Sequence, residues 1–123
     1  MATGLVWGIR GATTVEADEP ALIDEAVLEL LSELLERNDL TPEDCISILF
    51  TATADLVSTF PATAARHAGF GDVPLICAQE IPVPGSMERC IRVLLHVHTT
   101  HERSDLHHVY LRGAKGLRDD LPR

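Results

Sequence analysis

The stretch CIRVLLHVHTT, from Cys90 to Thr100, is the most strand-like part of this chain. Side chains of a strand alternate between two faces, so one face here carries Cys90, Arg92, Leu94, His96 and His98. The opposite face is wholly aliphatic and consists of Ile91, Val93, Leu95 and Val97. Such a strand predicts a sheet with one face covered by helices and with an arginine in the middle of the other face.

Two further elements precede this strand. Residues 5–15, LVWGIRGATTV, predict a strand in which Gly8 and Gly11 mark a bulge or the close approach of another backbone or a ligand. A helix is predicted to begin near Pro20 and to end at Asn38, because Pro suits the first turn of a helix and Asn its end. Its apolar positions recur at helical spacing, which indicates an amphipathic helix against the sheet.

The rest of the chain continues in short elements. We predict a capped turn at 41–44, a strand at 45–51, a helix at 62–67 ended by Gly69, a strand at 73–78, a turn at 83–86 and a last strand at 108–111. This order indicates an α+β fold, a mixed sheet with helices on one face. A core this small leaves the other face partly uncovered, and association with further copies would bury it.

Composition narrows the class of protein. The chain has 123 residues, which predicts one domain over 1–123, and 46% of them are hydrophobic, which excludes general disorder. The net charge of −9 repels phosphate backbones, and only 4% of the residues are aromatic, so no nucleic acid is expected as a partner. Nine of the ten basic residues are Arg, the side chain that suits bidentate binding of carboxylates.

The cysteines and the apolar runs predict the compartment. Three cysteines without CxxC spacing indicate a reducing compartment and no disulfide framework. No run of about 18 apolar residues predicts a membrane span, and no basic and apolar leader predicts secretion. We therefore expect a cytoplasmic protein.

Three kinds of site are compatible with the residues alone. His96, His98, His101 and Glu102 are possible zinc ligands, but their spacing fits no established zinc pattern and equally suits a solvated turn. Cys77, near Glu80, is a possible nucleophile or an inert buried thiol. Arg92, and similarly Arg10, lies among apolar residues, where a guanidinium needs either a protein acid such as Glu80 or a ligand anion.

Five motifs give the chain a resemblance to a known family. The chain resembles the small trimeric class of chorismate mutases, and the matching motifs occur in family order. They are GIRGATTVE (8–16), TATADL with FPATAAR (51–66), VPLICAQE (73–80), CIRV (90–93) and HVYLRGAKGLRDDL (108–121).

The resemblance implies a fold and a reaction. It implies a homotrimer of α+β subunits that form a pseudo-α/β barrel, with active sites in clefts between neighbouring subunits. The implied reaction is the isomerisation of chorismate to prephenate in the shikimate pathway toward phenylalanine and tyrosine. The ether C–O bond breaks while a C–C bond forms within one molecule, so no nucleophile, proton transfer, metal or cofactor is required.

The resemblance also assigns roles to residues. Arg92 and Glu80 match the catalytic positions, and Arg92 would donate to the ether oxygen as it becomes negative. Arg10 and Tyr110 match residues that bind a substrate carboxylate. Glu80 and Cys77 match contacts to the ring hydroxyl. The other matched positions around the substrate are Phe60, Arg66, Ile76, Ala78, Gln79, Leu117 and Arg118.

Two alternatives remain beside this interpretation, a small-molecule deaminase and a non-catalytic module that binds a carboxylate metabolite on a similar trimeric fold. A deaminase needs a positioned water and an acid–base residue, which the sequence does not clearly supply. One position departs from the family pattern, because Thr63 stands where some members carry a lysine. The missing charge is expected to slow capture of a dianion without abolishing the chemical step.

Overall fold

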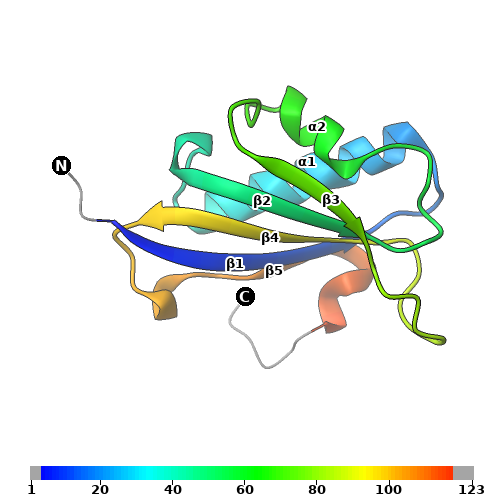
Figure 1. Cartoon of the computed structure of the whole chain (residues 1–123). Helices are drawn as coiled ribbons and strands as arrows, with labels where there is room; N and C mark the ends of the chain where they lie inside the picture. Colours follow the sequence, from blue (N-terminus) through cyan, green and yellow to red (C-terminus); the bar gives the residue numbers. More distant parts are fainter. Residues whose placement is uncertain (1–3, 118–123) are drawn as a thin grey trace.

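A computed structural model describes residues 4–117 and places five strands in one sheet, in the order β3-β2-β4-β1-β5 (Figure 1). The strands are β1 (Leu5–Thr14), β2 (Cys45–Ala52), β3 (Leu75–Gln79), β4 (Cys90–Thr99) and β5 (Val109–Tyr110). The central strand β4 is antiparallel to β1 and β2, whereas β2–β3 and β1–β5 are parallel pairs. The predicted mixed sheet is thus confirmed, and the strand-like segment that begins at Cys90 is its central strand.

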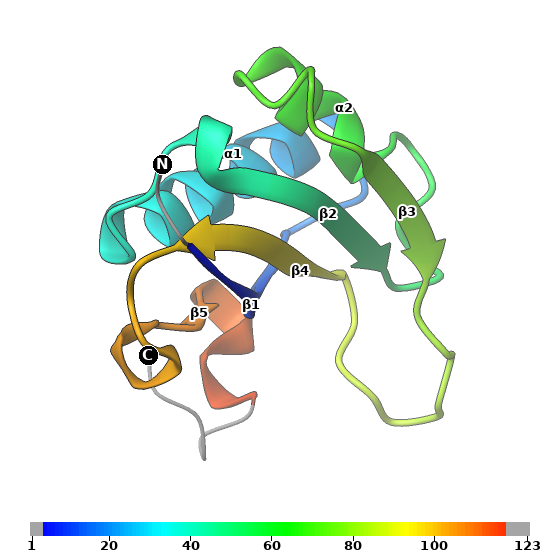
Figure 2. The same cartoon turned by 60° about the vertical axis from the view of Figure 1, so that its left-hand side comes forward.

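Helices cover one face of the sheet. Figure 2 shows α1 (Pro20–Arg37) and α2 (Pro61–His67) together on the same side of the curved strands. The apolar stripe of α1 is fully buried against the strands and comprises Ile23, Val27, Leu30 and Leu34. The predicted helix ends are confirmed, since α1 begins at Pro20 and Asn38 is its C-cap residue.

Short 3-10 turns complete the fold: η1 (Pro42–Asp44), η2 (Arg103–Asp105) and η3 (Arg112–Gly116). The predicted capped turn corresponds to η1, where the backbone N–H of Thr41 donates to the Asp44 carboxylate at 2.8 Å. η2 and η3 were not predicted. No helix within residues 4–117 is long and apolar enough to cross a membrane.

Two predicted strands are shorter than expected. The strand predicted at 73–78 begins only at Leu75, because the Val73 N–H closes a turn onto the Phe70 carbonyl at 3.1 Å and Pro74 has no N–H. The last strand keeps only Val109 and Tyr110. Beside it, the imidazole Nδ1 of His108 accepts the Arg10 N–H at 2.9 Å, so a side chain takes the place of a backbone partner.

The predicted alternation along β4 is confirmed. Ile91, Val93, Leu95 and Val97 are buried on the helix side, whereas Arg92 and His98 are exposed on the other side. Neither β1 glycine faces a closely approaching backbone; at Gly11 the tight neighbour is instead a side chain, because an added Cβ would lie 3.1 Å from Leu30 of α1. The expected bulge is also absent, because β1 pairs with β4 continuously. The sheet face opposite the helices therefore remains open around Arg92 and His98, whereas Ala12, Cys90 and Tyr110 on the same face are buried.

Candidate active site

Three of the predicted site residues lie together on the open face of the sheet. Arg10 of β1, Arg92 of β4 and Glu80, directly after β3, line one hollow. Its remaining lining comes from Leu49, Thr51, Val93 and Leu94. The strand order explains this convergence, since β4 lies between β1 and β2 and all three side chains project from the same side. The site is thus built on adjacent strands.

Arg92 has one acid partner in the described part of the chain. Its Nε lies 3.4 Å from Oε2 of Glu80, and 44% of its side chain remains exposed. The structural ion pair considered from the sequence therefore exists. It leaves the guanidinium accessible from the hollow, so an ion pair with Glu80 and contact with a ligand are compatible.

Arg10 differs from Arg92 because its guanidinium forms no ion pair within residues 4–117, although the residue is half-buried. Two guanidiniums and one carboxylate thus line the hollow, which makes it locally positive in a chain of net charge −9. A partly desolvated cation without a protein partner favours an anionic ligand. The geometry therefore suits a small molecule that carries negative charge.

A further polar residue in the hollow was missed from the sequence. The Thr51 hydroxyl donates to Oε2 of Glu80, the oxygen that faces Arg92. Its signal in the sequence is slight, a threonine at the end of the apolar run CISILF. Only the pairing of β2 with β3 and β4 brings Thr51 beside Glu80.

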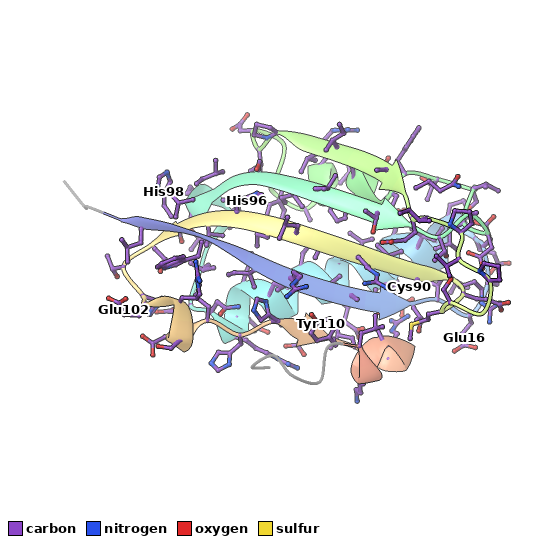
Figure 3. All side chains as sticks on the ribbon, turned by 60° about the horizontal axis from the view of Figure 1, so that its bottom comes forward. Glu16, Cys90, His96, His98, Glu102 and Tyr110 are labelled. Carbon is purple, nitrogen blue, oxygen red and sulfur yellow. The ribbon has the colours of Figure 1, made fainter. Side chains whose placement is uncertain are left out.

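Tyr110 lies on the same side of the sheet as Arg92. In the register Tyr110 faces Ala12, and Ala12 faces Arg92. Tyr110 packs in a small cluster with Ala12, Cys90 and Ala114, and Leu117 lies against this cluster. Figure 3 labels Cys90 and Tyr110. Its hydroxyl is buried and has no hydrogen-bond partner among the described residues. Such an unpaired donor is suited to a ligand oxygen.

Cys90 shares this cluster and lies beside Arg92. Burial raises the pKa of the Cys90 thiol, although the neighbouring Arg92 guanidinium acts in the opposite direction. The thiol is therefore protonated at neutral pH and contributes packing rather than nucleophilicity.

A second cavity, of about 430 Å³, lies along the edge strand β3. Phe60, at the start of α2, lines it together with Cys77, Ala78 and Gln79. Phe60 is 70% exposed, so a large aromatic side chain stands open to solvent. Seven predicted site residues thus line two cavities, with Arg10, Glu80 and Arg92 in the first and Phe60, Cys77, Ala78 and Gln79 in the second.

The remaining predicted positions lie apart from Arg92 within this chain. The Cys77 side chain packs against the core, on the face of β3 opposite to Glu80, so the structure does not bring its thiol to that carboxylate. Ile76 is 64% exposed on β3, and Arg66 is exposed on α2. Arg118 lies outside the described residues. Its role and those of Cys77, Phe60, Arg66 and Ile76 stay predictions.

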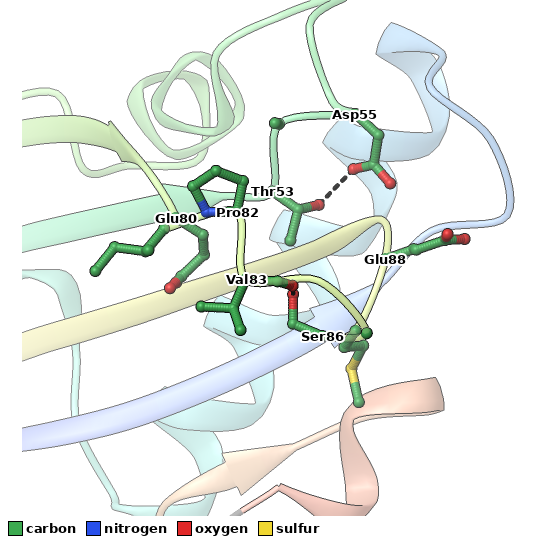
Figure 4. Close-up of a pocket in the computed structure, with 11 residues that line it drawn as sticks. Thr53, Asp55, Glu80, Pro82, Val83, Ser86 and Glu88 are labelled. Atoms are coloured by element: carbon green, nitrogen blue, oxygen red, sulfur yellow. Dashed lines mark hydrogen bonds between the residues drawn. The ribbon is translucent and has the colours of Figure 1, made fainter.

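The loop between β3 and β4 forms a third cavity, of about 240 Å³, beside Glu80 (Figure 4). Thr53 donates to Asp55, and the Asp55 carboxylate accepts the Arg89 N–H at 3.0 Å. The Cys90 N–H donates to the Thr53 hydroxyl at 3.0 Å. These bonds fix the first residues of β4 and thereby the position of Arg92, two residues further along.

The histidine cluster does not form a metal centre. Across the described range, 4–117, no three His, Cys, Asp or Glu side chains are gathered closely enough to hold a metal ion. His96 instead lies within 3.1 Å of the Ser47 hydroxyl, and His98 is exposed at the end of β4.

Several known proteins are similar to this chain in sequence. Residues 6–121 match the family described as chorismate mutase type I. The chain is 50% identical to "Chorismate mutase AroH" of Thermus thermophilus over 118 residues, which covers 95% of this chain and 97% of that protein. It is 42% identical to the protein of the same name from Bacillus subtilis (strain 168), again over 118 residues, with 95% and 93% covered.

A solved structure adds the fold. "Chorismate mutase from Clostridium thermocellum Cth-682" superposes with a TM-score of 0.87 at 50% identity and covers 89% of this chain and 97% of its own. A match of this extent and identity supports the fold described above. This chain therefore belongs to the chorismate mutase type I family.

Proposed function

We propose that the chain, acting as one domain over 1–123, is a cytoplasmic isomerase that converts chorismate to prephenate for phenylalanine and tyrosine synthesis. The reaction is an intramolecular rearrangement in which the ether C–O bond breaks as a C–C bond forms, and no proton or electron leaves the molecule. The protein must hold the dianion in its compact reactive conformer and stabilise the charge that develops on the ether oxygen. At about a 10⁶-fold acceleration these effects together supply roughly 8 kcal/mol.

One observation carries the proposal: Arg10 and Arg92 line one hollow that contains a single carboxylate, Glu80, in a chain of this family. Arg92 donates to the ether oxygen, since its accessible guanidinium is already oriented by Glu80. One well-placed donor of this kind is worth about 3–4 kcal/mol. Arg10, which has no acid partner in the described range, binds a substrate carboxylate together with the Tyr110 hydroxyl.

The active site is proposed to lie between two subunits of a homotrimer. The hollow around Arg92 measures about 170 Å³, whereas complete ligand sites usually span about 300–1,000 Å³. A neighbouring subunit would enlarge it by bringing its own β3 cavity, lined by Phe60 and Cys77, against the open face. Docking onto that face would also cover the exposed Ile76 and Ile81. Cys77 and Glu80 of one site then come from different chains.

The direct test follows the loss of chorismate absorbance with purified protein, in the presence of a chelator. Turnover that is insensitive to the chelator is expected, because the rearrangement needs no metal. Arg92→Lys is expected to lose most of the activity while the fold survives, since lysine keeps the charge but not the planar fork. Absence of turnover in the wild-type protein would overturn the proposal, and near-wild-type turnover of Arg92→Lys would overturn the role of Arg92.

A further inference from the structure

We infer that Thr51 is a positioning residue for the reaction: its hydroxyl holds the Glu80 carboxylate in the orientation that pairs with Arg92. The inference rests on the proposed function, and nothing in the five motif assignments gives Thr51 a role. Among residues 4–117, Thr51 supplies the only side-chain hydroxyl that lines the hollow.

The strand register places Thr51 between the two groups that it would connect. On one side Thr51 faces Arg92 of β4, and on the other side it faces Ala78 of β3. Glu80 lies two residues beyond Ala78 and continues the ladder, because its N–H donates to the Ala52 carbonyl at 2.9 Å. All three side chains therefore project from the same face of adjacent strands.

The contacts of the Glu80 carboxylate point to the same role. Within residues 4–117 it has two side-chain partners, the Thr51 hydroxyl and Nε of Arg92, and both use Oε2. Leu49, Val93 and Leu94 form much of the surrounding wall and offer no side-chain donor. Loss of the Thr51 hydroxyl would leave Arg92 as the only side chain that orients this carboxylate.

An ion pair alone is a weak orienting device at this position. The side chains of Arg92 and Glu80 are 44% and 27% exposed, and pairs of this kind are loosened by water and by side-chain entropy. Thr51 is β-branched and lies within a strand, so its hydroxyl occupies one of few positions. The hydroxyl of Thr51 thus fixes the orientation of the Glu80 carboxylate, and this carboxylate in turn orients the Arg92 guanidinium.

The test compares Thr51→Val, which removes the hydroxyl at nearly constant volume, with Thr51→Ser, which keeps it. We expect kcat to fall roughly 10- to 100-fold in Thr51→Val with little change in KM, as for loss of one hydrogen bond to a charged group. Thr51→Ser is expected to stay within about threefold of the wild type. Ser47→Ala removes a hydroxyl from the same strand outside the hollow and serves as the matched control, with unchanged kcat.

A double-mutant cycle separates positioning from packing. In a Glu80→Ala background the Thr51 hydroxyl has no carboxylate to hold, so Thr51→Val should cause no further loss. An equal loss in both backgrounds would overturn the inference, as would wild-type kcat in Thr51→Val. The wild-type rate in the same assay tests the proposed function separately. If Thr51→Val does not fold, as judged by circular dichroism, Thr51→Ala replaces it in the cycle with the same expectations.

Discussion

At the scale of single residues, the site contains polar groups that the described part of the chain leaves without a partner. The Arg10 guanidinium has no acid partner there, and the Tyr110 hydroxyl is buried without a hydrogen bond. Both conditions cost stability, because a desolvated polar group loses its contacts with water. A bound carboxylate would offset both costs. Its binding would therefore be stabilised by the partner that it gives to each of these two groups.

Tyr110→Phe tests this arrangement directly. Because the hydroxyl has no partner in the described chain, we expect the free energy of unfolding to stay the same or to rise by about 1 kcal/mol. The KM for chorismate should rise about tenfold, since one hydrogen bond to a carboxylate is lost. Urea unfolding and steady-state kinetics measure the two effects. A marked loss of stability with unchanged KM would assign the hydroxyl a structural role instead.

Cys45 makes stability depend on alkaline pH. Burial, followed by the negative charges of Asp44 and Glu43, raises the pKa of the Cys45 thiol from about 9 to about 12. The unfolded chain releases this proton first, so the stabilisation is complete below pH 9 and is lost as the pH rises toward 12. The thermal midpoint of the wild type should therefore fall more steeply between pH 8 and about pH 10.5 than that of Cys45→Ala. Parallel curves for the two proteins would contradict this assignment.

At the scale of elements, Asn38 joins the end of α1 to the segment before β5. Its side-chain amide donates to the carbonyls of Leu34 and His107, both at 2.9 Å, and its carbonyl accepts the His107 N–H at 2.7 Å. The residue is 3% exposed. Because β5 carries Tyr110, one buried amide at the helix end also sets where a site residue lies.

Asn38→Ala should be strongly destabilising. It removes three hydrogen bonds of a buried side chain, two to the backbone of His107 and one to the Leu34 carbonyl, which costs about 2–4 kcal/mol in free energy of unfolding. The neighbouring Arg37→Ala is the matched control, since its exposed pair with Glu33, at 3.4 Å, is worth less than about 1 kcal/mol. Chemical denaturation of both variants gives the comparison. Similar losses of unfolding free energy in the two variants would show that Asn38 does not hold the end of α1 to the segment before β5.

Some features of these elements follow from local sequence, and others depend on how the strands pair. The period of two along 90–100, the helix start at Pro20 and the helix end at Asn38 depend on neighbours in the chain, and these predictions were confirmed. The His108 ring that replaces a backbone partner and the Thr51 hydroxyl against Glu80 depend on strand register, which local periodicity does not contain. The resemblance predicted Arg10, Glu80 and Arg92, and the structure brings them to one hollow.

At the scale of the whole molecule, the predicted site residues fall on two sides of the edge strand β3. The Arg92 hollow occupies the open face, whereas Phe60 lines the other cavity and Arg66 is exposed on α2. One complete site would then need two copies of the chain. This division can be measured without a structure of the assembly.

Mixing two inactive variants tests the division. Arg66→Ala and Arg92→Ala, unfolded together and reassembled in equal amounts, should recover up to about a quarter of the wild-type activity, because random trimers place two intact halves at about one site in four. Each variant carried alone through the same procedure is the control. Mixed trimers that remain inactive would show that both residues act within one subunit, whereas activity of Arg66→Ala alone would show that Arg66 lies outside the site.

The overall charge should affect substrate capture. A chain of net charge −9 repels a dianion, and Thr63 on α2 carries no positive charge to oppose this. Thr63→Lys is therefore expected to raise kcat/KM severalfold at low ionic strength, and the advantage should disappear near 0.5 M salt, where screening acts within about 4 Å. Thr63→Gln controls for size. An advantage that persists at high salt would indicate a direct contact instead.

The position of β3 at the sheet edge has a consequence for biogenesis. Its outer backbone groups lack a strand neighbour in the described chain. It carries the exposed side chain of Ile76 and is followed by the exposed Ile81. A free apolar edge recruits foreign strands, which is how folding intermediates aggregate. The refolding yield should therefore have an optimum in protein concentration. In dilute solution the chains do not assemble with further copies, and at high concentration they aggregate before assembly covers β3.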